Sequence, residues 1–129
     1  MRGLAVYLTL IFFVGLPKEH RLKHWRDFKT IYSQGKRFRG DALAIILLPQ
    51  PAAPTKIGIS ISRKVSKKAV VRNLIKRRIR HACRTLLPQI QPGWHIVITV
   101  RYNARECEYE HFLQELKRLL IQAEVFHGH

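Results

Sequence analysis

The sequence predicts one domain of mixed α and β structure, with elements in the order α-β-β-α-β-α. Its 129 residues suffice for one hydrophobic core but not for two. Hydrophobic residues make up 47% of the chain, with only seven glycines and six prolines, which is typical of a folded domain. Segments with apolar residues at helical spacing alternate with short β-rich runs, which indicates the mixed class.

The first fifteen residues differ from the rest. A charged start precedes an apolar run at 4–14, as in a signal peptide, but the run is too short for a membrane span, which needs about 20 residues. We interpret 1–15 as an extension or as a start codon assigned upstream of the true one. The domain is then 16–126, followed by a tail at 127–129. Strong basicity without a disulfide pattern indicates the cytoplasm.

The first predicted helix ends near Gly35, which we expect to adopt a left-handed conformation. Trp25, Phe28, Ile31 and Tyr32 share one face of this helix. We expect Trp25 and Ile31 to be core residues. Phe28 and Tyr32 are expected to be partly exposed, because aromatic rings within a basic surface can stack bases of single-stranded nucleic acid.

Three β-rich segments are separated by turn-forming residues. Residues 41–48 are almost entirely apolar and predict a strand covered on both faces, with a possible extra strand or hairpin beginning at Lys36. The proline-rich stretch 49–54 predicts a loop. Residues 56–62 alternate apolar with small or polar side chains, and 94–101 form the third strand.

Residues 62–84 contain ten Lys or Arg residues and no acidic residue. Apolar residues recur every three or four positions, which predicts a helix with a core side and a cationic side. Ser66 or the pair Lys67 and Lys68 would begin it, and Pro88 would stop it. The predicted apolar stripe is Val71, Leu74, Ile75, Ile79, Ala82, Cys83 and Leu86.

The charge of this helix indicates a polyanionic partner. A solvated helix face normally mixes signs, because like charges four residues apart repel. The whole chain has 24 Lys and Arg against 8 Asp and Glu, a formal net charge of +16. Nucleic acid is the expected partner, with an anionic membrane, reached through residues 4–14, as an alternative.

The last predicted helix runs from an N-cap at Asn103 to about Val125. It carries five of the eight acidic residues, so we expect it to face away from the polyanion. The acidic residues are Glu106, Glu108, Glu110, Glu115 and Glu124, and the apolar stripe is Tyr109, Phe112, Leu113, Leu116, Leu119 and Leu120.

Motifs for hydrolytic chemistry are absent from the sequence. His20 and His24 have no third ligand at suitable spacing, and Cys83 and Cys107 lack metal-ligand spacing. Cys83 is expected to be a small core residue. There is no nucleophile motif and no glycine-rich phosphate loop. We therefore expect no cofactor or metal in the protein, and no hydrolysis by this chain alone.

The segment 59–80 resembles the signature of the protein subunit of bacterial ribonuclease P. Residues 16–22, with Asp27-Phe28 and 32–35, are similar to that family's opening, and the resemblance continues in order to about Ala123. It implies a two-layer α/β sandwich like the second domain of a small-subunit ribosomal protein, with a left-handed β-α-β crossover. Without the resemblance, a right-handed connection would be expected.

The resemblance also implies a subunit of an endoribonuclease that binds RNA without cutting it. In this family the RNA subunit holds the Mg²⁺ ions that activate water for removal of the precursor tRNA 5′ leader. A monomeric protein would bind that RNA one to one. The implied RNA-subunit face is Arg63, Lys64, Lys67, Lys68, Arg72, Asn73, Lys76, Arg77 and Arg80. The implied leader-binding residues are Phe28 and Tyr32, with Lys36 or Arg37 as phosphate contacts.

Two departures from the family pattern affect these sites. The family's Arg-Asn-Arg core ends in Leu74 here, so one contact is lost or is supplied by Arg77 or Arg78. An aromatic residue often found near Ile46 is absent, which implies weaker stacking on the leader. A generic basic RNA-binding or ribosome-associated protein without a processing role is the alternative.

Overall fold

The computed structural model describes residues 16–127. Their main elements follow the predicted order with one extra strand. The helices are α2 (Trp25–Gln34), α3 (Ala69–Leu86) and α4 (Tyr109–Gln122), and the strands are β1 (Lys36–Arg39), β2 (Leu43–Pro49), β3 (Lys56–Ser60) and β4 (Trp94–Val100). Short 3-10 turns lie at Lys18–His20, Leu87–Gln89 and Tyr102–Glu106. The interpretation of residues 1–15 as an extension or a misassigned start lies outside the described residues.

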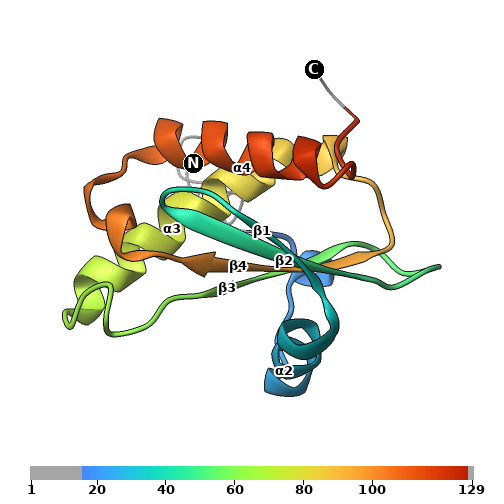
Figure 1. Ribbon diagram of the computed structural model, residues 1–129, viewed down its shortest axis with the longest axis horizontal. Helices are drawn as coiled ribbons and strands as arrows, with labels where there is room; N and C mark the ends of the chain where they lie inside the picture. Colours follow the sequence, from blue (N-terminus) through green and yellow to red (C-terminus); the bar gives the residue numbers. More distant parts are fainter. Residues whose placement is uncertain (1–15, 128–129) are drawn as a thin grey trace, which may run out of the picture.

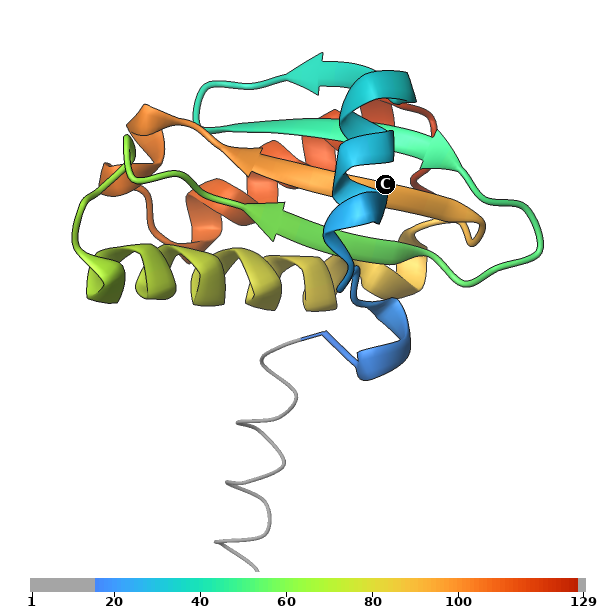
Figure 2. The ribbon, with the colours of Figure 1, turned by 90° about the horizontal axis from the view of Figure 1, so that it is seen from below.

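The four strands form one mixed sheet in the order β1-β2-β4-β3. β2 is antiparallel to both β1 and β4, whereas β3 and β4 are parallel. Helices α3 and α4 lie on one face of the sheet, and α2 crosses the other face (Figures 1 and 2). Residues 16–127 therefore form an α+β fold with three α-helices, and α2 adds a partial third layer to the expected two-layer sandwich.

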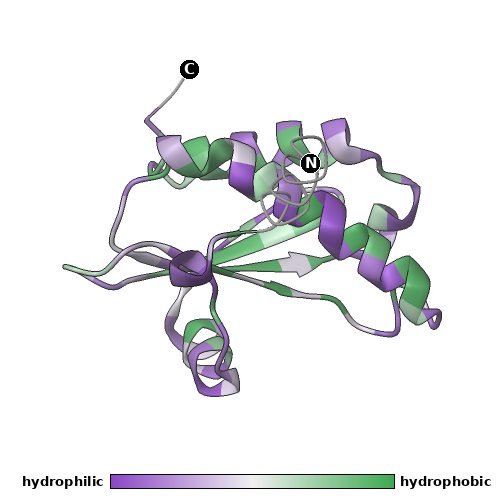
Figure 3. Cartoon of the chain, turned by 180° about the vertical axis from the view of Figure 1, so that it is seen from behind, coloured by the Kyte–Doolittle hydropathy of each residue, from purple (hydrophilic) through white to green (hydrophobic). Residues whose placement is uncertain are grey.

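Two hydrophobic clusters lie on opposite faces of the sheet. The larger one joins the sheet to α3 and α4, and the smaller one, with Leu22, Ile31, Ile46 and Val97, joins it to α2. Successive residues of β2 point to opposite faces, so Ile45 belongs to the first cluster and Ile46 to the second. Hydrophobic residues accordingly run along the strands in Figure 3. The expectation that this strand is covered on both faces is confirmed.

Helix α3 has the bounds that its sequence predicted. Lys68 is its N-cap, the helix ends at Leu86, and Pro88 lies in the 3-10 turn that follows. Cys83 is fully buried, as expected. Leu74 is 40% exposed and lies outside the apolar stripe, because the buried residues Ile75, Ile79 and Ala82 define a narrower contact with the sheet and α4.

Two other expectations about helix ends and burial were wrong. Gly35 has φ −79° and ψ 161°, an extended conformation, because the chain passes directly from α2 into β1. Trp25 is 68% exposed because it is the first residue of α2, beyond the contact with the sheet, whereas Ile31 is buried as expected. Tyr32 and Phe28 are partly buried, which matches the expected partial exposure.

The start of α4 also differs from the expectation. Asn103 lies within a 3-10 turn, and its side-chain amide donates to the Asp41 carbonyl at 3.4 Å. The N-cap is Glu108, whose carboxylate accepts a hydrogen bond from the His111 backbone, while His111 Nδ1 accepts from the Glu108 backbone at 3.2 Å. The helix ends at Gln122, earlier than expected, because Glu124 turns the chain with φ 63°.

Candidate RNA-binding surfaces

A short loop before α3 carries four cations into solvent. Val65 is 3% exposed and anchors the loop 61–68 in the core. Ser62 Oγ accepts a hydrogen bond from the Lys64 backbone at 3.1 Å, and Ser66 Oγ accepts from the Lys68 backbone at 3.2 Å. Because the backbone is held in this way, the charged side chains point outward. These exposed residues are Arg63, Lys64, Lys67 and Lys68.

Helix α3 continues the cationic surface. Asn73, Arg77 and Arg80 are exposed, and Arg72 and Lys76 are half-buried. Arg72 Nη1 donates to the Ser66 carbonyl at 2.8 Å, which ties the helix to the loop. Within residues 16–127, no carboxylate lies within 4.0 Å of the cations in this group. The structure therefore brings the predicted RNA-subunit residues onto one continuous surface of a single sign. We call the loop and these α3 residues the basic face.

Arg78 has a different environment from Arg77. Its Nη1 donates to the Cys107 carbonyl at 2.8 Å, and its Nη2 lies 3.3 Å from Glu108 Oε1. Arg78 therefore links α3 to the start of α4. Arg77 and Arg78 were considered as substitutes for the family arginine that Leu74 replaces. Of these two, only Arg77 extends from the exposed side of the helix.

The other predicted site lies between α2 and the sheet. The Phe28 ring packs against Gly58, and the Tyr32 hydroxyl lies 3.2 Å from Thr99 Oγ1. Arg37 is paired with Ile46 in the sheet and its guanidinium carbon lies 6.0 Å from the centre of the Tyr32 ring. The structure thus brings Phe28, Tyr32 and Arg37 together, and we call this group the α2 site.

Lys36 does not join the α2 site. It is paired with Leu47, which belongs to the cluster under α3 and α4, and its ammonium lies 5.4 Å from the Phe38 ring centre. Adjacent residues of a strand point to opposite faces, so only one of Lys36 and Arg37 can face α2. Burial lowers the pKa of His95 in β4, which favours its neutral imidazole.

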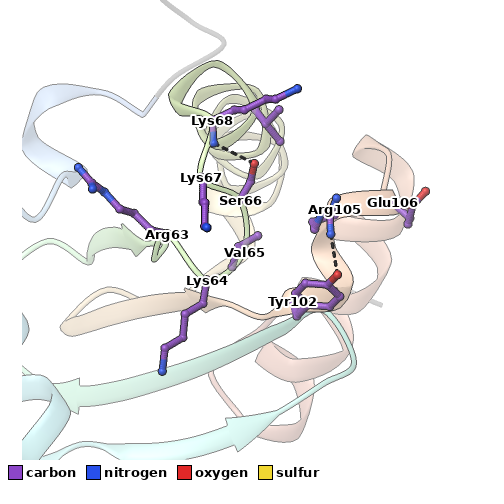
Figure 4. A pocket seen from close by; sticks show the side chains of 10 residues that line it. Arg63, Lys64, Val65, Ser66, Lys67, Lys68, Tyr102, Arg105 and Glu106 are labelled. Atoms are coloured by element: carbon purple, nitrogen blue, oxygen red, sulfur yellow. Dashed lines mark hydrogen bonds between the residues drawn. The ribbon is translucent and has the colours of Figure 1, made fainter.

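We call the loop 61–68 the basic loop. An open pocket of about 500 Å³ lies where this loop meets the 3-10 turn after β4 (Figure 4). Tyr102 and Arg105 line its second wall. The sequence-based prediction did not include these two residues. An aromatic residue just after a predicted strand, followed by an arginine three positions later, was the available signal.

Comparison with known proteins identifies the family. A family model described as ribonuclease P matches residues 16–124. The ribonuclease P protein component of a Picosynechococcus species is 98% identical over 116 residues, which cover 90% of this chain and 100% of that protein. The chain belongs to the ribonuclease P protein family. Ribonuclease P is the endoribonuclease that processes the 5′ leaders of precursor tRNAs, and this chain is one of its subunits. The generic RNA-binding alternative is therefore set aside.

More distant members of the family agree with this. The ribonuclease P protein component of Microcystis aeruginosa is 54% identical, over 90% of this chain and 100% of its own length. The solved ribonuclease P protein of Staphylococcus aureus has a TM-score of 0.76 and 28% identity, over 84% of this chain and 99% of that one. That of Thermotoga maritima has a TM-score of 0.72 and 26% identity, over 79% and 96%. The ribonuclease P protein fold is thus shared across the described domain.

Two further findings concern metal ligands and membrane spans in the described residues. Residues 16–127 contain no group of three His, Cys, Asp or Glu side chains that could hold a metal ion. Within the same range, no helix has the length and apolar character needed to cross a membrane.

Proposed function

We propose that the basic face binds the ribonuclease P RNA subunit. This assignment rests on one observation: the cationic side chains extend from a loop and a helix whose backbones are held by hydrogen bonds. The Arg72 bond to the Ser66 carbonyl, together with the two serine turns, holds the loop and helix as one surface. Such a surface gains affinity by releasing counterions from phosphates, and its rigidity favours a structured RNA.

The proposed RNA-subunit residues keep their individual assignments. Asn73 is the polar, uncharged member and is suited to a base edge or a ribose hydroxyl, whereas the cations are suited to phosphates. They are Arg63, Lys64, Lys67, Lys68, Arg72, Asn73, Lys76, Arg77 and Arg80.

We propose that the α2 site binds the 5′ leader of precursor tRNA. Phe28 and Tyr32 are partly exposed rings beside a cation, Arg37, which suits a single strand whose bases stack while its phosphate is neutralised. Ile46 supplies no aromatic ring under this site, so stacking there rests on Phe28 and Tyr32. Lys36, on the other face of β1, is retained only as a phosphate contact at the edge of the sheet.

The roles of the protein and the RNA subunit are proposed from the family resemblance. We propose that the RNA subunit performs the catalysis and holds Mg²⁺, and that one protein, monomeric alone, binds one RNA in the cytoplasm. The domain is proposed to be 16–126. We further propose that the connection from β3 through α3 to the parallel neighbour β4 is a left-handed crossover.

Removal of two charges from the basic face tests the first proposal. Arg72→Gln with Lys76→Gln should weaken binding of the RNA subunit and reduce the slope of log K against log salt by roughly 1.4 to 1.8. Arg118→Gln, on the exposed side of α4, is the matched control and should change neither. An unchanged slope in the double variant would refute the assignment of the basic face.

A processing assay tests the role of the whole domain. Residues 16–129 should stimulate cleavage of a 5′-labelled precursor tRNA by ribonuclease P RNA at low Mg²⁺, and the protein alone should cut nothing. Phe28→Ala with Tyr32→Ala should weaken precursor tRNA but not mature tRNA, by about 1–3 kcal/mol per lost stack. Equal weakening of both tRNAs would show that the rings act only in the core.

A further inference from the structure

The pocket beside the basic loop is formed by two segments that are distant in sequence. Residues 63–68 and Val71 form one wall, and Tyr102, Arg105 and Glu106 form the other. Figure 4 shows the basic loop facing Tyr102 and Arg105 across this space. Its volume of about 500 Å³ is within the range of sites that bind small organic molecules, about 300 to 1,000 Å³.

The charge of the pocket favours an anion. Five cationic side chains line it against a single carboxylate, that of Glu106. Helix α3 begins at this pocket with no side-chain cap and no acidic residue in its first turn, so the partial positive charge of its N-terminus adds to the same potential. The five cationic residues are Arg63, Lys64, Lys67, Lys68 and Arg105.

Tyr102 gives the pocket a second kind of contact. Its side chain is 62% exposed and belongs to neither hydrophobic cluster, so packing does not explain it. Arg105 Nη1 donates to the Tyr102 hydroxyl at 2.6 Å, and the Arg105 guanidinium carbon lies 5.1 Å from the ring centre. Arg105 thereby fixes the orientation of the ring, and most of its surface stays accessible. A planar partner can stack there.

We propose that this pocket binds one unstacked nucleotide of the ribonuclease P RNA subunit. The base stacks on Tyr102, and its phosphate is held by the lysines of the basic loop. A single nucleotide combines a planar base with an anionic phosphate, which are the two chemistries that the pocket presents. This inference rests on the proposed role of the basic face and adds a specific subsite to it.

The position of the pocket distinguishes the RNA subunit from the leader. Lys67, Lys68 and Val71 continue directly into Arg72 and the rest of the basic face. The α2 site lies across the sheet from α3 (Figure 1). A strand that follows the basic face therefore reaches Tyr102 without crossing the sheet.

Binding of full-length variants to ribonuclease P RNA tests the proposal. Tyr102→Ala should weaken binding roughly 5- to 150-fold, the range expected when one base stack is lost. Because no charge is removed, its salt slope should equal that of the unchanged protein. Tyr102→Phe keeps the ring and should bind within about twofold of the unchanged protein, as should the control Arg118→Gln. Equal binding by Tyr102→Ala and the unchanged protein would overturn the proposal.

Photo-cross-linking identifies the occupant. Benzoylphenylalanine at position 102 should cross-link to one discrete position of the RNA subunit, and Lys67→Gln with Lys68→Gln should reduce the yield. Cross-linking to the labelled leader alone, or to many RNA positions equally, would refute it. If Arg72→Gln with Lys76→Gln lowers the salt slope while Tyr102→Ala binds normally, only the nucleotide pocket is wrong. If neither variant has an effect, the basic-face assignment itself fails.

Discussion

Gly58 of β3 lies directly under the ring of Phe28 of α2. A β-carbon at position 58 would be 2.4 Å from Phe28 Cζ and 2.8 Å from Cε2, so the two residues can only be this close because Gly58 has no side chain. Gly58 is paired with Val97, a member of the smaller cluster, in the parallel register of β3 and β4. The position of Phe28, and hence of the α2 site, depends on this contact.

Gly58→Ala should therefore displace Phe28. We expect a loss of about 1–3 kcal/mol in the free energy of unfolding, because the methyl group overpacks a filled contact. The affinity for precursor tRNA should also fall, because the Phe28 ring moves. Urea unfolding and tRNA binding measure the two effects. Ser60→Ala, two residues along the same strand, is the control and should stay within about 0.5 kcal/mol. An undisturbed Gly58→Ala protein would show that α2 shifts freely over the sheet.

Arg77 and Arg78 are neighbours with opposite roles. Arg78→Gln should cost about 1–2 kcal/mol of stability, because it removes the bonds to Cys107 and Glu108, and should leave the salt slope of RNA binding nearly unchanged. Arg77→Gln should leave stability intact and reduce the slope by roughly 0.7 to 0.9. Thermal unfolding and salt titration of both variants test the pair, and interchanged effects would contradict the assignment.

Leu74 is an exposed apolar residue of α3, next in sequence to Asn73 of the basic face. Leu74→Arg restores the family pattern and should strengthen binding of the RNA subunit, with a salt slope steeper by roughly 0.7 to 0.9 per new phosphate contact. Leu74→Gln is the uncharged control and should leave the slope unchanged. If Leu74→Gln steepened the salt slope, or if Leu74→Arg left it unchanged, position 74 would not face the RNA.

Glu115 of α4 joins that helix to the start of β2. Its Oε2 accepts hydrogen bonds from the backbone of Ala42 at 2.9 Å and of Leu43 at 2.6 Å. Glu115→Ala should cost about 2–3 kcal/mol, because both donors belong to buried residues and lose their partner. Glu110→Ala, on the exposed side of α4, is the control. Chemical denaturation measures the difference, and equal stability of the two variants would disprove the role of Glu115.

The two cysteines should differ in reactivity. Burial raises the pKa of the Cys83 thiol to about 12, and burial also raises that of Cys107, which is only partly covered. At pH 8, a maleimide should label Cys107 alone in the folded protein, and Cys83 only after denaturation. Cys107→Ser should abolish labelling of the folded protein. Rapid labelling of Cys83 at pH 8 would show that α3 opens locally.

Ionisation of Cys83 also predicts a loss of stability in alkali. In the unfolded chain this thiol ionises near its ordinary pKa of about 9, whereas the folded protein keeps the proton up to about 12. The unfolded state therefore holds fewer protons between these values, and stability falls as pH rises through them. Cys83→Ala should show a smaller decrease in unfolding free energy over this pH range.

Local chemistry explains the expectations that were confirmed. The bounds of α3 depend on the periodicity of Ile75, Ile79 and Ala82 within the helix and on Pro88, two residues after its end. The two-sided burial of β2 follows from its uninterrupted apolar run. Nothing beyond neighbouring residues was needed for either.

The expectations that failed concern the ends of elements and their surroundings. Asn103 is a good N-cap by residue type, but its amide is used by the Asp41 carbonyl, and Glu108 forms the capping box instead. Trp25 has the spacing of a core residue, but α2 begins beyond the sheet, so the sheet does not cover it. Contacts between distant segments decided both outcomes.

The sequence by itself determined the order of the elements, the net charge and the cationic side of α3, because periodicity and composition are properties of adjacent residues. Only the tertiary structure decided that Arg37 rather than Lys36 faces α2, that Arg78 binds α4 while Arg77 stays exposed, and that Tyr102 meets the basic loop. Each of these depends on strand register or on the packing of segments far apart in the chain. Spacing within one element carries no information about which residue of another element lies opposite.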